Sequence, residues 1–257
     1  MSKALLYDAT LCVGCKACEG ACAEQNKLPY DETIAAEQVQ SDHKFTVVLN
    51  KNEKYMRRLC MHCQDPACAS VCPVGALHKT AAGPVVYEED RCMGCRYCMA
   101  ACPFGVPKYE WSKVLPKVQK CVMCPDRVAA GRPTACTEAC PTGATKFGER
   151  EELIQEARDR IRQNPSNYVP HVFGIEEVGG TSVLILSGVA FEEFGLKPNE
   201  LPKDPLPLYT YRVLSRIPDF VPLGGMVLGG VWWITHRREE VAAAEAAEKK
   251  EDRGGSR

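Results

Sequence analysis

The sequence predicts an α+β chain in which a small cysteine-rich unit is duplicated, followed by a loop-rich arm and one apolar C-terminal helix. All 16 cysteines of the 257 residues fall into four blocks of four. Short strand and turn patterns separate these blocks. A charge-free run, residues 220–235, lies near the C-terminus. These observations indicate a cysteine-bound cofactor domain joined to a candidate membrane helix.

The third block carries the most specific signal. Cys92, Cys95, Cys98 and Cys102 follow the spacing C-x2-C-x2-C-x3-C-P, which is the ferredoxin run for a 4Fe–4S cluster. Gly94 lets backbone amides approach the cluster sulfurs closely. The alternative is a zinc site, but zinc sites are built mainly from C-x2–4-C pairs that stand well apart.

The other three blocks vary this spacing. The first has the same spacing but places Ala23 where the run has proline, the second lengthens the middle gap to four residues, and the fourth lengthens it to eleven. Their cysteines are Cys12, Cys15, Cys18 and Cys22 (first), Cys60, Cys63, Cys68 and Cys72 (second), and Cys121, Cys124, Cys136 and Cys140 (fourth). His62 lies inside the second block, and because four cysteines already complete that set we expect it to be solvated or hydrogen-bonded rather than ligating.

A repeated phrase closes the later blocks: Cys72-Pro-Val-Gly, Cys102-Pro-Phe-Gly and Cys140-Pro-Thr-Gly. This internal repetition predicts a duplicated ferredoxin-like unit. Because every cysteine belongs to a block, none is left for a disulfide framework. The thiols must therefore be reduced when clusters are inserted, which predicts assembly in the cytoplasm.

Strand patterns are predicted at residues 3–8, 45–49 and 182–187, and a hairpin at 76–87 turns at Gly83-Pro84. Residues 149–163 read as an amphipathic helix that ends at Asn164-Pro165. Residues 166–210 are rich in proline and glycine and are expected to form an extended arm.

The charge-free run 220–235 would rise about 24 Å as a helix, a little short of a ~30 Å hydrocarbon core. Gly225 and Gly229 form a G-x-x-x-G face suited to close packing with another membrane helix. Trp232 and Trp233 suit a membrane interface. A buried helix of a soluble protein is the alternative, but the glycine pairs argue against it, since each glycine would cost ~1 kcal/mol against alanine.

The overall charge excludes one class of partner. A net charge of −1 gives no field that would attract nucleic acid. The residues before Cys12 hold neither a twin arginine nor an apolar segment, so no export signal is expected there.

Four such blocks followed by one apolar span resemble the iron–sulfur (beta) subunits of membrane-bound respiratory formate dehydrogenases and of periplasmic nickel–iron hydrogenases, four-cluster ferredoxin-type electron-transfer subunits of the DMSO reductase group. Four short segments are similar to sequences of that group: Cys60-Met-His-Cys, Val106-Pro-Lys-Tyr, Phe147-Gly-Glu-Arg and Gly179-Gly-Thr-Ser. The resemblance covers residues 4–236.

The resemblance implies four 4Fe–4S clusters in a line and no catalysis by this chain itself. It also implies two partners: a catalytic alpha subunit, either a molybdenum or tungsten formate dehydrogenase or a nickel–iron hydrogenase, and an integral membrane subunit that reduces quinone. The absent export signal favours the formate dehydrogenase reading. A soluble polyferredoxin is the alternative. The sequence names neither substrate nor direction of electron flow.

In a two-cluster ferredoxin the fourth cysteine of each run ligates the other cluster. Applied to adjacent and outer blocks, this rule predicts four ligand sets: set A (Cys12, Cys15, Cys18, Cys140), set B (Cys121, Cys124, Cys136, Cys22), set C (Cys60, Cys63, Cys68, Cys102) and set D (Cys92, Cys95, Cys98, Cys72).

The expected organisation is a duplicated two-cluster ferredoxin-like domain at 1–148, with lobe one at 1–30 and 112–148 and lobe two at 56–111. A helix and arm follow at 149–215, then a transmembrane helix at 216–237 and a charged tail at 238–257. Arg237 and Arg238 follow the span directly, so the positive-inside tendency puts the C-terminus in the cytoplasm and the cluster domain on the periplasmic side of the inner membrane. The resemblance implies that a partner bearing a twin-arginine signal carries the folded domain across.

Overall fold

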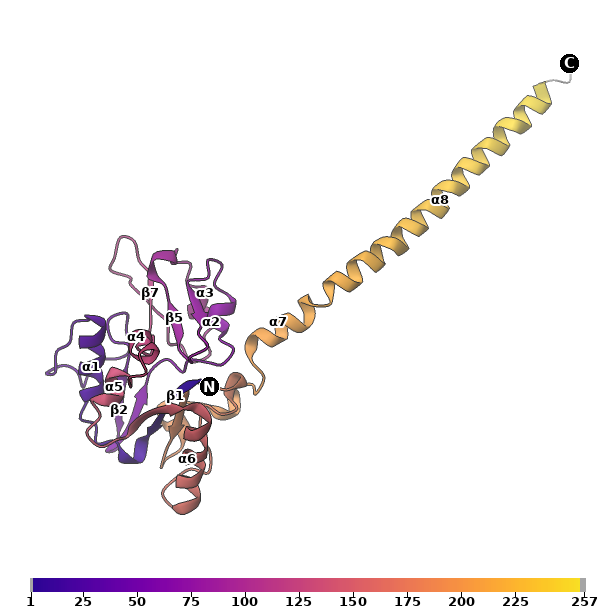
Figure 1. Cartoon of the computed structure of the whole chain (residues 1–257). Helices are drawn as coiled ribbons and strands as arrows, with labels where there is room; N and C mark the ends of the chain where they lie inside the picture. Colours follow the sequence, from indigo (N-terminus) through magenta and orange to yellow (C-terminus); the bar gives the residue numbers. More distant parts are fainter. Residues whose placement is uncertain (1, 255–257) are drawn as a thin grey trace. The chain divides into compact units, whose positions relative to one another are not determined.

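The computed structural model describes residues 2–254, with side chains to residue 249, and the chain divides into two compact units, Met1–Pro207 and Leu208–Arg257 (Figure 1). The first unit holds every cysteine. The second holds nearly all of the C-terminal helical segment.

A three-stranded sheet organises the first unit. Strand β1 (Lys3–Asp8) lies between β8 (Thr145–Glu149), which is antiparallel to it, and β9 (Val183–Leu186), which is parallel. Strands are therefore present where the sequence predicted them near residues 3–8 and 182–187. Alternate residues of β1 serve two cores, since successive side chains of a strand point to opposite faces.

Helix α6 (Arg150–Gln163) covers one face of this sheet, as the amphipathic pattern predicted. Its apolar side packs Leu153, Ile154 and Ala157 against Ala4 and Leu6 of β1. The opposite face of β1 contributes Leu5 and Tyr7 to a second core, which contains cysteines of all four blocks. The sheet thus separates a layer without cysteines from the cysteine layer.

Short helices mark the four cysteine blocks: α1 (Ala17–Asn26), α2 (Ala67–Ser70), α3 (Tyr97–Ala101) and α5 (Ala135–Glu138). Helix α1 packs against α5, and α2 packs against α3. Figure 1 shows the same two pairs as neighbours. Block one therefore meets block four, and block two meets block three.

The strands pair the same blocks as the helices do. In the inner pair, β4 (Leu77–Lys79) follows block two and β5 (Val85–Tyr87) precedes block three, and the two are antiparallel. In the outer pair, β8 follows block four and β1 precedes block one, again antiparallel. Blocks one and four with their strands therefore form an outer lobe arranged like the inner lobe of blocks two and three. In the outer lobe the two halves come in the opposite order along the chain, so it is a permuted copy.

Two further hairpins complete the cysteine layer. Strand β2 (Val47–Lys51) pairs with β3 (Lys54–Arg58) just before block two, and β6 (Lys108–Tyr109) pairs with β7 (Val118–Gln119) just before block four. Strand β2 begins two residues later than the predicted strand at 45–49. Helix α4 (Pro125–Ala129) occupies the long middle loop of block four.

The segment after α6 is packed rather than extended. Apart from β9 it forms short 3-10 turns at Glu177–Gly179 (η3), Phe191–Phe194 (η4) and Pro198–Glu200 (η5). Phe173 and Phe191 are fully buried in the cysteine-side core, where their rings lie 5.5 Å apart. Part of the predicted arm therefore completes the core of the first unit.

Helix α7 (Leu206–Leu214) crosses the boundary between the units, and α8 (Ile217–Gly254) follows. Within residues 2–254, the segment Leu206–Lys249 is the one helical stretch long and apolar enough to cross a membrane. No residue of its apolar window is buried within the described part of the chain. The helix continues from the charge-free run into the charged tail without a break.

Candidate iron–sulfur centres

Two glycines shape the loops that open the first and third blocks. Gly14 and Gly94 have φ of +71° and +72°, a left-handed conformation that favours glycine. A Cβ on Gly14 would lie 2.3 Å from the Tyr55 ring, and one on Gly94 would lie 2.7 Å from the Pro116 carbonyl oxygen. These positions therefore need glycine for its backbone conformation and for the close approach of neighbours.

The repeated Cys-Pro-x-Gly phrase forms one turn three times. The amides of Gly75, Gly105 and Gly143 donate to the carbonyls of Cys72, Cys102 and Cys140, and all three glycines have φ between +62° and +66°. Block one lacks the proline, and α1 continues past Cys22 to Asn26. Ala23 thus keeps the cysteine in place but changes how the chain leaves it, since proline is disfavoured inside a helix.

A small, largely enclosed cavity is lined by the four cysteines of set D, Cys72, Cys92, Cys95 and Cys98. Cys72 comes from block two and the other three from block three. Burial, and then the neighbouring Cys92, Cys95 and Cys72, raise the pKa of Cys98 to about 11. The structure therefore brings this cross-block set together around one space.

A second enclosed cavity is lined by the four cysteines of set B, Cys22, Cys121, Cys124 and Cys136. Here Cys22 comes from block one, whereas the other three cysteines come from block four. Burial, and then Cys121 and Cys136, raise the pKa of Cys22 well above its ordinary value. The permuted outer lobe thus repeats the crossing seen in the inner lobe.

The cysteines of set C also lie close together. Burial, and then Cys60, Cys102 and Cys68, raise the pKa of Cys63. Cys102 comes from block three, and its pKa is raised by burial and by Cys60. All four members therefore neighbour one another across two blocks.

Backbone pairing joins the two segments that carry the cysteines of set A. The amide of Asp8, four residues before Cys12, donates to the carbonyl of Ala144, four residues after Cys140, at 2.7 Å. Cys12 and Cys140 pack against the same core, and Cys12 is close enough to Cys18 to contribute to the raised pKa of that thiol, after burial. Cys15 is exposed.

The chemistry of these sites fits an anionic group larger than a single ion. Among residues 2–254 no three His, Cys, Asp or Glu side chains converge on one metal-ion position. Tyr87 lines the set D cavity, and its buried hydroxyl lies close to the thiol of Cys92. Arg57 lines the set B cavity as a buried cation. Cysteine thiols with a phenol beside one cavity and a cation beside the other suit clusters that carry negative charge.

His62 is buried and hydrogen-bonded, not solvated. Its Nδ1 accepts the amide proton of Val85 at 2.9 Å, so the neutral ring carries its proton on Nε2. Burial, together with Lys120 and Lys79, lowers its pKa well below the ordinary value. The hydrogen-bonding role expected from the sequence therefore holds, and solvation does not.

Three buried groups beside the cysteines went unmarked in the sequence: Arg57, Lys120 and Tyr87. Lys120 donates to the carbonyls of Val85 and Cys121. Arginine, lysine and tyrosine are ordinary surface residues, so no spacing distinguishes these three. The one available signal is position, because each lies within five residues of a block.

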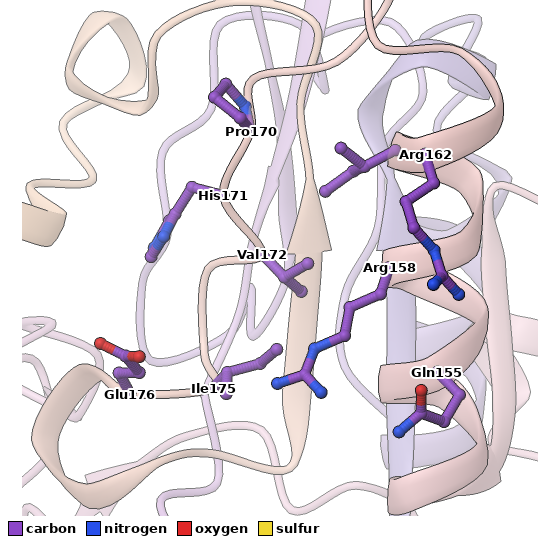
Figure 2. Close-up of a pocket in the computed structure, with 9 residues that line it drawn as sticks. Gln155, Arg158, Arg162, Pro170, His171, Val172, Ile175 and Glu176 are labelled. Atoms are coloured by element: carbon purple, nitrogen blue, oxygen red, sulfur yellow. The ribbon is translucent and has the colours of Figure 1, made fainter.

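One open pocket with basic side chains lies away from the cysteines. Figure 2 shows this cavity of about 460 Å³ between α6 and the segment that carries Pro170 and Val172. Arg158 and Arg162 extend over it from α6, while His171 and Glu176 stand on the other side. None of the predicted ligands lines it.

Comparison with known proteins agrees with this geometry. Residues 51–150 match the family described as a 4Fe-4S dicluster domain. The chain is 41% identical over 261 residues to a protein of Nitratidesulfovibrio vulgaris, a match that covers 96% of this chain and 70% of that one.

Two relatives have descriptive names. The chain is 38% identical to the hydrogenase-2 operon protein HybA of Escherichia coli O157:H7, over 76% of this chain and 73% of that one. It is 34% identical to the formate dehydrogenase iron-sulfur subunit of Haemophilus influenzae, over 89% of this chain and 78% of that one. The chain therefore belongs to the iron–sulfur protein family that includes HybA and the formate dehydrogenase iron–sulfur subunits.

Proposed function

We propose that this chain is an electron-transfer subunit that holds four 4Fe–4S clusters, one in each of sets A to D, and links a catalytic subunit to a quinone-reactive membrane subunit. The observation that carries the proposal is the crossing of the blocks, because Cys72 and Cys22 each line a cavity with three cysteines of another block. When bound, such clusters accept and release single electrons. The cysteines hold and space them.

The neighbours of the cysteines support one order for the proposed sets. Burial raises the pKa of Cys18 to about 11, and Cys136 of set B adds to the rise. Burial, followed by Cys60 of set C, raises the pKa of Cys121 to about 12. Burial also raises the pKa of Cys68 to about 12, with a smaller part from Cys98 of set D. The order A–B–C–D fits a linear relay.

The two ends of this order reach the surface. Cys15 of set A and Cys95 of set D are the two exposed cysteines. Exposed apolar side chains flank both, with Val13 beside Cys15 and Met93 and Tyr97 beside Cys95. Apolar surface at both ends supports contact with one partner at each.

Iron content tests the number of clusters. Four sets of four thiolates predict about sixteen irons and as many sulfides per chain, if each cube takes four thiolates. The measurement is anaerobic iron and sulfide analysis of purified protein. About eight irons, or stoichiometric zinc, contradicts the proposal.

Serine variants test the ligand sets. Cys22→Ser and Cys136→Ser should alter the same low-temperature EPR signal, because both residues belong to set B. Cys18→Ser should alter a different one, although Cys18 and Cys22 stand in the same block. A common signal for Cys18 and Cys22, with Cys136 acting elsewhere, would refute the crossed sets.

The catalytic partner follows from copurification. Of the two relatives named above, the formate dehydrogenase iron–sulfur subunit matches the larger share of this chain, which favours a formate dehydrogenase as the partner. HybA has the higher sequence identity, so a nickel–iron hydrogenase is the second candidate. The subunit that copurifies anaerobically distinguishes them. The isolated chain should be reducible by dithionite yet turn over neither formate nor hydrogen, and activity of its own would overturn the assignment as a non-catalytic subunit.

A further inference from the structure

Arg57 is a buried cation with no carboxylate partner in the described part of the chain. It lies in β3 and is 1% exposed. Its Nε donates to Thr46 Oγ1 at 2.9 Å and its Nη1 to Thr145 Oγ1 at 3.2 Å. Both acceptors are neutral hydroxyls, so these bonds orient the guanidinium but leave its charge unbalanced.

A buried charge of this kind is strongly unfavourable unless an opposite charge lies beside it. The same neighbourhood shows what ordinary compensation looks like, since buried Lys44 pairs with buried Glu19 at 2.6 Å. Arg57 receives no such partner. Something other than a carboxylate must supply its counter-charge.

The negative neighbours of Arg57 are cysteines. It lines the cavity of set B. Cys136 of set B and Cys18 of set A are the cysteines with which the guanidinium interacts most strongly. Arg57 therefore stands between set B and set A.

The next junction repeats the arrangement. Lys120 is buried and donates only to the carbonyls of Val85 and Cys121 among protein groups that the structure describes. Its ammonium group lies close enough to interact with both Cys121 of set B and Cys68 of set C. Two unpaired cations at two consecutive junctions indicate a common role rather than a local accident.

We propose that Arg57 is a positioning residue that fixes a positive charge at the junction of sets A and B and raises the reduction potential of the group held there. This inference rests on the proposed function. Reduction by dithionite adds one electron, hence one negative charge, with no bond made or broken. A fixed cation stabilises the more negative state, so its removal must favour the oxidised one.

The test is an EPR-monitored redox titration of the full-length protein, purified anaerobically. Arg57→Met removes the charge, Arg57→Gln keeps hydrogen-bond donors without it, and Arg57→Lys keeps it. The two neutral variants should shift one reduction equilibrium at least tenfold toward the oxidised state, which is about 59 mV for one electron. Arg57→Lys should stay within that limit.

A matched control is Arg158→Met, which loses an exposed guanidinium at the pocket between α6 and the segment with Pro170, where no cysteine lies. It should leave every potential unchanged. Wild-type potentials in a fully loaded Arg57→Met protein would overturn the proposal.

If the neutral variants bind less iron, the lysine variant decides. Full iron with Arg57→Lys supports a requirement for charge, whereas iron loss in all three variants overturns the proposal because shape, not charge, would then matter. Failure of the proposed function is separate, since it would appear as a low iron content in the unaltered chain.

Discussion

Gly94 and Gly131 share one backbone conformation but differ in what surrounds them. Their φ values are +72° and +71°. A Cβ on Gly94 would lie 2.7 Å from a backbone carbonyl, while one on Gly131 would meet nothing within 4 Å. The pair separates the cost of a left-handed alanine from the cost of a collision.

We expect Gly131→Ala to cost about 1 kcal/mol, from the backbone conformation alone. Gly94→Ala should cost about 1–3 kcal/mol more, because the Pro116 carbonyl belongs to the backbone and must shift. Apparent Tm of the iron-loaded proteins, measured at one scan rate, checks this. Equal Tm values for the two variants would mean that the backbone around Gly94 can shift without a measurable loss of stability.

His171 forms an ion pair whose strength depends on pH. Its Nε2 lies 2.6 Å from Oε1 of buried Glu177, and this contact, more than the opposing burial, raises the pKa of His171. Because the folded pKa lies above the unfolded one, the stabilisation is complete below the ordinary value of 6.5 and is lost as pH rises through the folded pKa.

His171→Gln should therefore lower the apparent Tm more at pH 5.5 than at pH 8.5. The difference corresponds to at most about 1 kcal/mol, since the histidine is partly exposed and solvent screens the pair. His43→Gln, at an exposed histidine beside Asp42, serves as the control. An equal loss of Tm at both pH values in His171→Gln would exclude a charged pair.

At the scale of elements, α8 presents a glycine face with nothing against it. A Cβ on Gly225, Gly229 or Gly230 would meet no atom within 4 Å, so the helix fold itself does not require these glycines. At 3.6 residues per turn Gly225 and Gly229 share a face, and Gly230 lies well off it. Close approach of another membrane helix would explain the pair.

We expect Gly225→Leu combined with Gly229→Leu to weaken copurification with the membrane subunit by at least tenfold, while the iron content stays unchanged. Gly230→Leu is the matched control and should retain the partner. Quantitative blotting of detergent extracts measures the ratio. Loss of the partner in the control alone would place the contact on a different face.

Local sequence patterns predicted many of the strands and helices, but they could not predict which distant segments pack together. The strands near 3–8 and 182–187 and helix 149–163 follow from alternation and amphipathic spacing, and the structure has all three. That residues 166–207 pack onto the core could not be predicted, because proline and glycine set local turns and say nothing of distant contacts. Buried Phe173 and Phe191 decide that packing.

The same limit applies at the site. Cysteine spacing led to the proposed ligand sets because each spacing is a geometric requirement of the group it would hold, and the cysteines of sets B and D each line one cavity. Arg57 and Lys120 could not be predicted, since their burial follows from the β2–β3 hairpin and from the strand pairing before block four. A single buried arginine or lysine has no characteristic spacing in the sequence that would distinguish it from a surface residue.

For the whole molecule, the proposed topology makes a simple prediction. Deleting residues 217–257 should release the protein from the membrane while all irons are retained, because the cysteines lie wholly in the first unit. Fractionation and iron analysis measure both. Persistent membrane binding would show that a partner, not α8, holds the chain there.

The side of the membrane is tested separately. Arg237 and Arg238 directly after the run predict a cytoplasmic C-terminus. A fluorescent reporter that folds only in the cytoplasm should therefore be active after Arg257. Alkaline phosphatase activity at the same fusion point would reverse the assignment.

The permuted outer lobe has a consequence for synthesis. Strand β1 must wait for β8, and under the proposed sets Cys22 and Cys140 each wait for a block at the other end of the domain. Sets C and D are complete once residue 102 has left the ribosome, but sets A and B stay open until residue 140 has been made. The first four thiols to emerge are thus among the last to be capped. Oxygen reaching the growing chain would damage the outer pair of centres before the inner one.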